Sequence, residues 1–190
     1  MGNVQAATFD DPTWPCQQRK VQELSIGLMW NQALPDGFDL DARRPLPSQA
    51  QDLVALLSLR RVSLAEAEDA VKSFSEDTEF ADPQTMLFIF AEIFTTLGKT
   101  RRDIINGIEQ YSMKQIALSE RIETTRSEMR DIEETTDPDF DRIDRLEEQL
   151  DWDERVFRDR TRSLTYVCET PVLIEKRLYA IAQLLLKYAR

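Results

Sequence analysis

Two heptad patterns separated by a short turn are the feature that most constrains the fold of this chain. Between residues 104 and 132, apolar side chains recur at alternating steps of four and three residues, with mostly Arg, Glu, Gln, Ser and Thr between them. This spacing places the apolar residues along one stripe of an otherwise solvated helix. The first seam comprises Ile104, Ile108, Tyr111, Gln115, Leu118, Ile122, Thr125, Met129 and Ile132.

A second seam with similar spacing follows the turn. It is weaker than the first, because two of its positions carry charged side chains. Even so, its apolar residues still fall on one face of a helix. The second seam comprises Ile143, Leu146, Leu150, Asp153, Phe157, Arg160, Leu164 and Val167.

The segment between the two seams is Thr135-Thr136-Asp137-Pro138. Asp at a cap position followed by Pro is typical of a helix start, since Pro lacks only an N–H that would have no helical partner. So short a connection makes the two helices antiparallel neighbours. We therefore predict a coiled-coil hairpin over residues 101–168. Folding about the turn pairs Ile132 with Ile143, Met129 with Leu146, Leu118 with Phe157 and, as a polar layer, Gln115 with Arg160.

The rest of the sequence predicts further helices rather than strands. The chain of 190 residues has only 5 glycines and is rich in residues with high helix propensity. Capping boxes at Ser48 and Ser63 are expected to open helices near 49–59 and 64–76. A buried, Phe-rich helix is expected from Asp82-Pro83 to Leu97, ended by Gly98 and followed by a new start at Thr100. A last helix should reach about Tyr188, with a break or a kink at Pro171.

The predicted fold class is all-α, a helical bundle built around the long antiparallel coiled-coil hairpin. Turn signals such as Asp11-Pro12 and Pro35-Asp36-Gly37 mark residues 1–47 as an extended N-terminal strap. The strap also carries tryptophan, phenylalanine and leucine side chains, which a disordered tail would lack. Residues 48–190 are expected to form one helical domain that is a single folding unit.

The chain has two cysteines, Cys16 and Cys168. With no C-x-x-C motif, they do not resemble a zinc or redox site. We expect them to form a structural disulfide in an oxidising compartment, and the alternative is two buried free thiols. In the predicted register Cys168 lies opposite Gly107, whose missing side chain would leave room for the strap that bears Cys16.

Charge and the absence of histidine restrict the function classes. The 24 basic and 35 acidic residues give a net charge of −11, whereas nucleic-acid binding needs a cationic face. Without histidine, the chain lacks the commonest general base and transition-metal ligand. Asp137, Asp139, Asp141 and Glu148 follow the outline of a calcium loop, but Arg142 stands where glycine is needed. We expect no catalytic residue, no metal, no cofactor and no enzyme activity.

The N-terminal residues suggest an exported protein. Val4-Gln5-Ala6 and Ala7 are similar to the end of a signal-peptide cleavage site, and the alternative, N-myristoylation, prefers Ser or Thr at the sixth position, where Ala6 stands. No run of eighteen apolar residues is present, so no membrane span is expected. We expect a processed protein in the periplasm.

Two blocks of sequence resemble uncharacterised secreted helical proteins of alphaproteobacteria. The first runs Trp14-Pro15-Cys16-Gln17-Gln18-Arg19-Lys20-Val21 and continues with Leu24-Ser25 and Trp30; the second is Arg101-Arg102-Asp103-Ile104-Ile105-Asn106-Gly107-Ile108-Glu109. The resemblance implies export to the periplasm. It implies no activity, substrate or catalytic residue.

Two functions from different classes fit these patterns. The first is a helical interaction or adaptor protein that docks on a protein partner in the cell envelope. Its docking surface would be the hairpin tip around Met129, Ile132, Asp137 and Ile143. The alternative is a binding module or chaperone that holds a small apolar ligand or peptide in a groove lined by Trp14, Trp30, Phe88 and Phe94.

Overall fold

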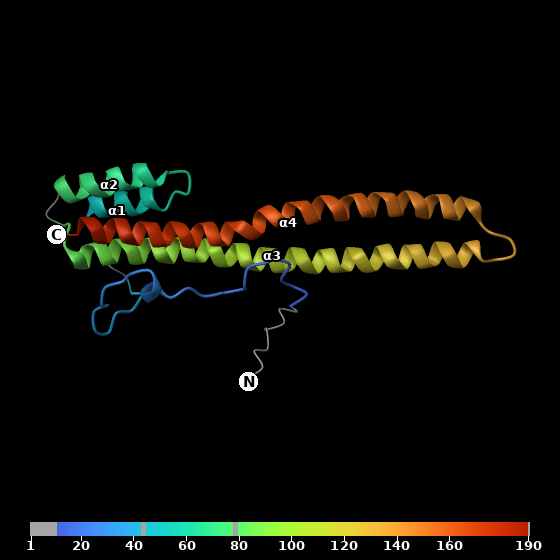
Figure 1. The fold of residues 1–190 in the computed structure, drawn as a ribbon, viewed down its shortest axis with the longest axis horizontal. Coiled ribbons are helices and arrows are strands. Elements are labelled where there is room, and N and C mark those ends of the chain that lie inside the picture. Colours follow the sequence, from blue (N-terminus) through green and yellow to red (C-terminus); the bar gives the residue numbers. More distant parts are fainter. Residues whose placement is uncertain (1–10, 43–44, 78–79, 190) are drawn as a thin grey trace, which may run out of the picture. The chain divides into compact units, whose positions relative to one another are not determined.

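The computed structural model describes residues 11–42, 45–77 and 80–189. The secondary structure of these residues is helical, which confirms the predicted all-α class. The two longest helices, α3 and α4, pack against each other as the arms of a hairpin (Figure 1). The elements are the 3-10 helix η1 (Ile26–Leu28) and the α-helices α1 (Ser48–Leu57), α2 (Leu64–Asp77), α3 (Pro83–Glu133) and α4 (Phe140–Tyr188).

The chain forms two compact units. The hairpin unit comprises Met1–Lys20 and Ile105–Glu169, and the core unit comprises Val21–Ile104 and Thr170–Arg190. The strap is therefore shared between the two units, with the change at Lys20 and Val21. The expected division into a strap of residues 1–47 and a single folding unit of residues 48–190 stays a prediction.

In the hairpin unit, the predicted seam is the buried interface. Of its apolar members, Ile108, Leu118, Ile122, Ile143 and Leu164 are buried, Val167 is exposed and the others are half-buried. The polar seam members Gln115, Thr125 and Asp153 are buried as well. The heptad pattern therefore identified most of the contact face, including three of its polar positions.

Gln115 and Arg160, predicted to form a polar layer, are not bonded to each other. The Gln115 amide donates instead to the carbonyl oxygen of Phe157 at 3.1 Å and to the Thr161 hydroxyl at 3.3 Å. The Arg160 guanidinium lies 5.9 Å from the centre of the Tyr111 ring. A long cationic side chain can cover an aromatic ring while its charge stays near water, which removes the need to bury it in the seam.

The core unit is held together by a continuous apolar cluster. The Phe-rich part of α3 and the C-terminal part of α4 supply its centre, including Phe90, Ile93, Leu178, Ile181 and Leu185, all fully buried. The C-terminal part of α4 therefore presents an apolar face to this cluster. Burying such side chains is the dominant favourable term in folding, about 1.5–3 kcal/mol for each large one.

Two arginines from the long helices bind backbone carbonyl groups in the core unit. Buried Arg101 donates to the carbonyl oxygens of Val21 and Gln22 and to the carboxylate of Glu175. Arg177 donates to the carbonyl oxygens of Leu57, Leu59 and Val62, at and beyond the C-terminus of α1. Burial lowers the pKa of the Arg177 guanidinium. Both arginines therefore satisfy carbonyl groups that lack a helical partner.

The expected stop at Gly98 is wrong, and of the break or kink expected at Pro171 the break is absent. α3 continues through Gly98, which is buried, and α4 continues through Pro171, also buried. A glycine inside a helix costs about 1 kcal/mol, and a proline about 3 kcal/mol or more. The buried residues on either side, such as Leu97 and Ile174, offset these local costs through tertiary packing.

One of the two predicted capping boxes is present. The Ser63 hydroxyl accepts a bond from the Glu66 backbone N–H at 3.2 Å, and the Glu66 carboxylate accepts one from the Ser63 N–H at 2.8 Å. Those bonds, the one from the Ser63 N–H first, lower the pKa of Glu66. At Ser48 the box is absent, because α1 begins at Ser48 itself and the Gln51 amide donates to the Leu46 carbonyl oxygen.

Asp82 caps the N-terminus of α3, and we expect a pH-dependent loss of stability when it is replaced. Its carboxylate accepts bonds from the backbone N–H groups of Gln84 and Thr85, both at 3.0 Å. Although partial burial raises the pKa of Asp82, these bonds and one from the Thr85 hydroxyl outweigh it, and the pKa lies below its ordinary value of 3.8. A depressed pKa means that the carboxylate stabilises the fold above that ordinary value and that this contribution is lost as the pH falls.

Asp82→Ala should therefore lower the free energy of unfolding by about 1 kcal/mol at neutral pH. The difference from wild type should shrink as the pH falls through the folded-state pKa, because the protonated carboxyl caps less well. Urea titrations followed by circular dichroism at several pH values measure it. Asp82→Asn, which keeps a cap oxygen without a titratable group, is the control. A deficit in Asp82→Ala that is the same at all pH values would contradict the assignment.

Candidate functional site

A disulfide ties the strap to the hairpin within the hairpin unit. Cys16 and Cys168 are bonded, with Cα atoms 5.5 Å apart, which confirms the predicted pairing. Around the bond, the Ser112 hydroxyl donates to the Pro12 carbonyl oxygen at 3.1 Å, and the Gln18 amide donates to the carbonyl oxygen of Cys168. The disulfide thus fixes an irregular segment onto the side of a regular helix pair.

Ionic contacts hold the end of the same segment. The Lys20 ammonium contacts the carboxylate of Glu109 on α3 and lies 3.4 Å from that of Asp11. The bond to Glu109, more than that to Asp11, raises the pKa of Lys20. Beside the disulfide lies a hollow of about 270 Å³, lined by Gln17, Thr161 and Glu169 among others. Its walls are mixed in polarity, unlike the mostly apolar walls typical of small-ligand pockets.

At the closed end of the hairpin, the seam continues almost to the turn. Ile143 is buried, Met129 and Ile132 are half-buried, and Asp137 is exposed. Three of the four residues predicted for a docking tip therefore pack at least partly between the helices rather than presenting an open apolar stripe. Their packing fixes the position of the turn.

The exposed apolar residue at this end is Phe140, the first residue of α4. Its side chain is 69% exposed. The heptad pattern did not single it out, because Phe140 belongs to neither seam. A large aromatic residue that lies off both seams and beside a turn is the signal that could have found it.

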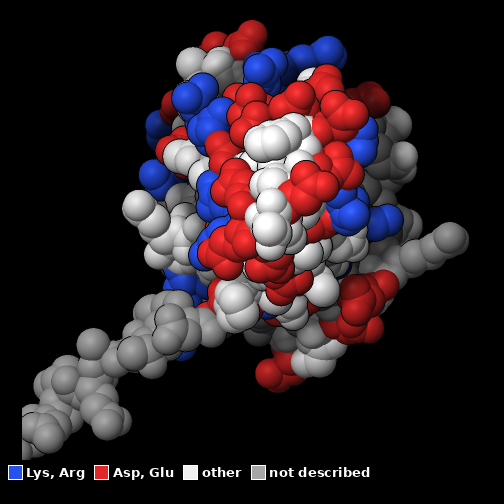
Figure 2. Space-filling view, turned by 90° about the vertical axis from the view of Figure 1, so that its right-hand side faces the viewer, with Lys and Arg blue, Asp and Glu red and all other residues white. Residues whose placement is uncertain are grey.

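Acidic residues surround Phe140 in the sequence. From residue 131 to 144, Arg142 is the one basic residue, and the acidic residues are Asp131, Glu133, Glu134, Asp137, Asp139, Asp141 and Asp144. Figure 2 looks onto this end of the hairpin and shows acidic side chains gathered around residues that are neither acidic nor basic. We call residues 131–144 the acidic tip.

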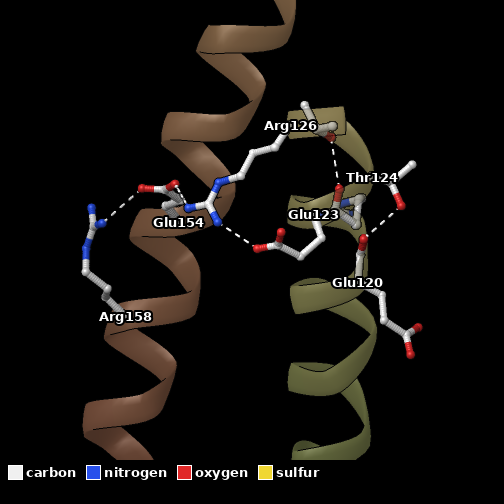
Figure 3. A network of polar contacts seen from close by, with 8 residues as sticks. Glu120, Glu123, Thr124, Arg126, Glu154 and Arg158 are labelled. Carbon is white, nitrogen blue, oxygen red and sulfur yellow. Dashed lines mark hydrogen bonds and ion pairs between the residues drawn. The ribbon is translucent and has the colours of Figure 1, made fainter. Parts of the chain in front are cut away.

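Below the tip, Arg126 and Arg158 are engaged by carboxylates of the hairpin. The Arg126 guanidinium donates to Glu123 on its own helix and to Glu154 on the other, each at 2.6 Å, and Arg158 lies 3.3 Å from Glu154 (Figure 3). Arg126, ahead of Arg158, lowers the pKa of Glu154. Within the described residues no acidic residue of the tip forms an ion pair, so the tip's negative charge is left uncompensated there.

Asp153 is, with Arg160, one of the two charged positions of the second seam. Buried between the helices, it accepts two hydrogen bonds from the Arg121 guanidinium, at 2.5 and 2.8 Å. Such a bidentate pair is directional, so it opposes sliding of one helix along the other.

The four residues of the predicted ligand groove have different roles in the structure. Trp30 and Phe94 are core residues, since Trp30 stacks on Phe90 with ring centres 5.5 Å apart and Phe90 in turn contacts Phe94. Phe88 is half-buried against the same cluster. Trp14 belongs to the hairpin unit, where its indole N–H donates to the Gln18 carbonyl oxygen at 2.7 Å. Their packing is that of structural side chains rather than of an open groove.

The described residues contain no group of three or more Cys, Asp or Glu side chains placed to hold a metal ion. Of the residues in the calcium-loop outline, Asp141 and Glu148 lie on α4 rather than on a loop. In the same part of the chain, no helix has both the length and the apolar character required to cross a membrane. The predicted signal-peptide site at Val4 to Ala7 lies outside the described residues.

Comparisons with known proteins assign no family to the acidic tip or to the strap. No family model, curated protein or solved structure matches this chain. The candidate site therefore depends on geometry and charge alone.

Proposed function

We propose that this chain is a non-enzymatic interaction protein, and that the acidic tip docks on a partner protein with a basic surface. The observation that carries the proposal is the exposure of Phe140 among uncompensated carboxylates. An aromatic side chain of this kind can anchor a complex by entering an apolar pocket of the partner. The surrounding negative charge would steer a basic partner and discriminate against acidic ones.

The structure around the tip supports a preorganised binding surface. Buried Ile143 and the bridging Arg126–Glu154 pair connect the two helices just below the turn. Surface ion pairs contribute little stability individually, but pairs between helices help to fix their register. A surface that is rigid before binding loses less conformational entropy on association.

We further propose that this interaction takes place in the periplasm. The Cys16–Cys168 disulfide supports this location, because structural disulfides persist in oxidising compartments. The resemblance to secreted proteins points the same way, and the partner would then be an envelope protein that exposes basic residues.

Replacing Phe140 and neutralising carboxylates of the acidic tip should each weaken binding of the partner. We expect Phe140→Ser, and separately the triple variant Asp131→Asn, Asp137→Asn and Asp144→Asn, to lower recovery of the partner at least about tenfold. The measurement is affinity capture from an envelope extract with quantitative mass spectrometry, repeated at low and high salt. Binding by wild type should fall with added salt, because exposed charges are screened.

The matched control is Tyr179→Ser, which removes an aromatic side chain that is 53% exposed in the core unit. It should leave recovery unchanged. Circular dichroism should show that all variants keep the helical content of wild type. Partners that are recovered equally by wild type and by both tip variants would refute the tip as the docking surface.

A further inference from the structure

The outward face of α4 carries a second stripe, opposite in character to the buried seam. Its members recur at alternating steps of four and three residues, so they share one line along the helix. All of them are exposed. This outer stripe comprises Asp141, Arg145, Glu148, Trp152, Arg155, Asp159, Arg162 and Tyr166.

Trp152 lies at the centre of the outer stripe with 63% of its side chain exposed. It borders an open hollow of about 580 Å³, whose walls include Arg145, Glu148 and Arg155. Within the described residues, these three charged side chains form no hydrogen bond or ion pair. An exposed tryptophan is typical of the energetic centre of an interface, and charged side chains around it are typical of the polar rim.

We infer that the outer stripe binds a second copy of this chain, antiparallel and related by a two-fold axis at Trp152. Such an axis places members of the outer stripe that lie the same number of stripe steps before and after Trp152 opposite each other on the two copies. The sequence then pairs opposite charges on both sides of the tryptophans. The pairs are Glu148 with Arg155, Arg145 with Asp159, and Asp141 with Arg162 of the second copy.

The charges of the outer stripe also disfavour other pairings of the two copies, namely shifted registers and a parallel orientation. Sliding the second copy one step along the stripe opposes Arg145 to Arg162 and Glu148 to Asp159. Sliding it the other way opposes Arg145 to Arg155 and Asp141 to Asp159. A parallel, in-register pairing would place every charged residue against its own copy. Like charges repel, so the sequence selects the antiparallel pairing centred on Trp152.

The contacts inside one chain leave these side chains available. The Asp159–Arg162 pair is 4.0 Å long and both side chains are exposed, so it can be exchanged for pairs with the second copy at little cost. Tyr166, which is 77% exposed, would extend the contact at each end of the interface. The symmetry doubles every favourable pair.

The test is the oligomeric state of the full chain, measured by sedimentation equilibrium over a range of concentrations. We expect a dimer of wild type whose dissociation constant rises at least about tenfold in Trp152→Ala. Glu148→Arg alone and Arg155→Glu alone should weaken it similarly, because each creates two like-charge contacts across the two-fold axis. The double variant with both changes restores opposite charges and should return the dissociation constant to within about threefold of wild type.

The double variant separates the proposed pairing from any general effect of the single changes. Tyr179→Ala, at an exposed aromatic residue of the core unit, is the control and should leave the dimer unchanged. A wild-type chain that stays monomeric at about 100 µM would overturn the inference. So would a dimer that persists in Trp152→Ala, or a double variant that is as weak as the two single variants.

Discussion

Removing the Cys16–Cys168 disulfide is expected to lower the free energy of unfolding by about 5 kcal/mol. The bond joins residues separated by 152 positions, so it restricts a large part of the unfolded chain. In the chain-entropy account, the stabilisation grows slowly with the length of the closed loop. The expected value is a substantial fraction of the stability of an ordinary domain.

Urea denaturation followed by circular dichroism measures this effect in the double variant Cys16→Ser and Cys168→Ser. Addition of a reductant should lower the stability of wild type to that of the variant and should leave the variant unchanged. This comparison separates loss of the bond from any effect of the serine side chains. A variant that stays within about 1 kcal/mol of wild type would show that the bond is not a major determinant of stability.

Trp30→Ala should cost about 3–5 kcal/mol, the usual range for truncation of a buried aromatic residue. Trp30 is only 2% exposed and stacks on Phe90, so its removal leaves a cavity in the core unit. If Trp30 instead lined an open ligand groove, the substitution would cost little, since an exposed side chain loses few contacts. The free energy of unfolding, measured by urea denaturation, therefore distinguishes the two assignments.

Tyr179→Ala is the matched control for the Trp30 substitution. Tyr179 lies in the same unit, but its side chain is largely exposed, and the change should stay within about 0.5 kcal/mol of wild type. Trp30→Phe should fall between the two, because it keeps an aromatic ring and leaves a smaller cavity. Equal losses for Trp30→Ala and Tyr179→Ala would refute the core assignment of Trp30.

The candidate site could be predicted only in part. The sequence located the turn and the tip, because the two seams are local patterns. The predicted helix start at Asp137-Pro138 is wrong by two residues, since α4 begins at Phe140 and the Asp139 carboxylate accepts a bond from the Arg142 backbone N–H. The sequence assigned docking to Ile143 and Met129, whereas Ile143 is buried and Met129 is half-buried between the helices. Phe140 and Trp152 were missed, since residues off the seam are visible as surface only when the packed face is known.

The sequence pattern also did not predict hydrogen bonds between residues that are far apart in the chain. Arg101 and Arg177 each bind carbonyl groups that are far away in the sequence, and no local signal announces such contacts. The same holds for Arg121, which supplies the partner for Asp153 at a position that the seam pattern marked as weak. Buried charge is acceptable only where a partner is in place, and that depends on the folded structure.

The sequence by itself determined the all-helical class, the two seams, the turn between them and the cysteine pair. These follow from side-chain periodicity and from the chemistry of individual residues, which act over a few positions. Only the tertiary structure decided that the helices continue through Gly98 and Pro171 and that Trp30 belongs to the core. At Gly98 and Pro171, the burial of many apolar side chains outweighs local preferences of a few kcal/mol. Burial, which also places Trp30 in the core, is a property of the whole fold.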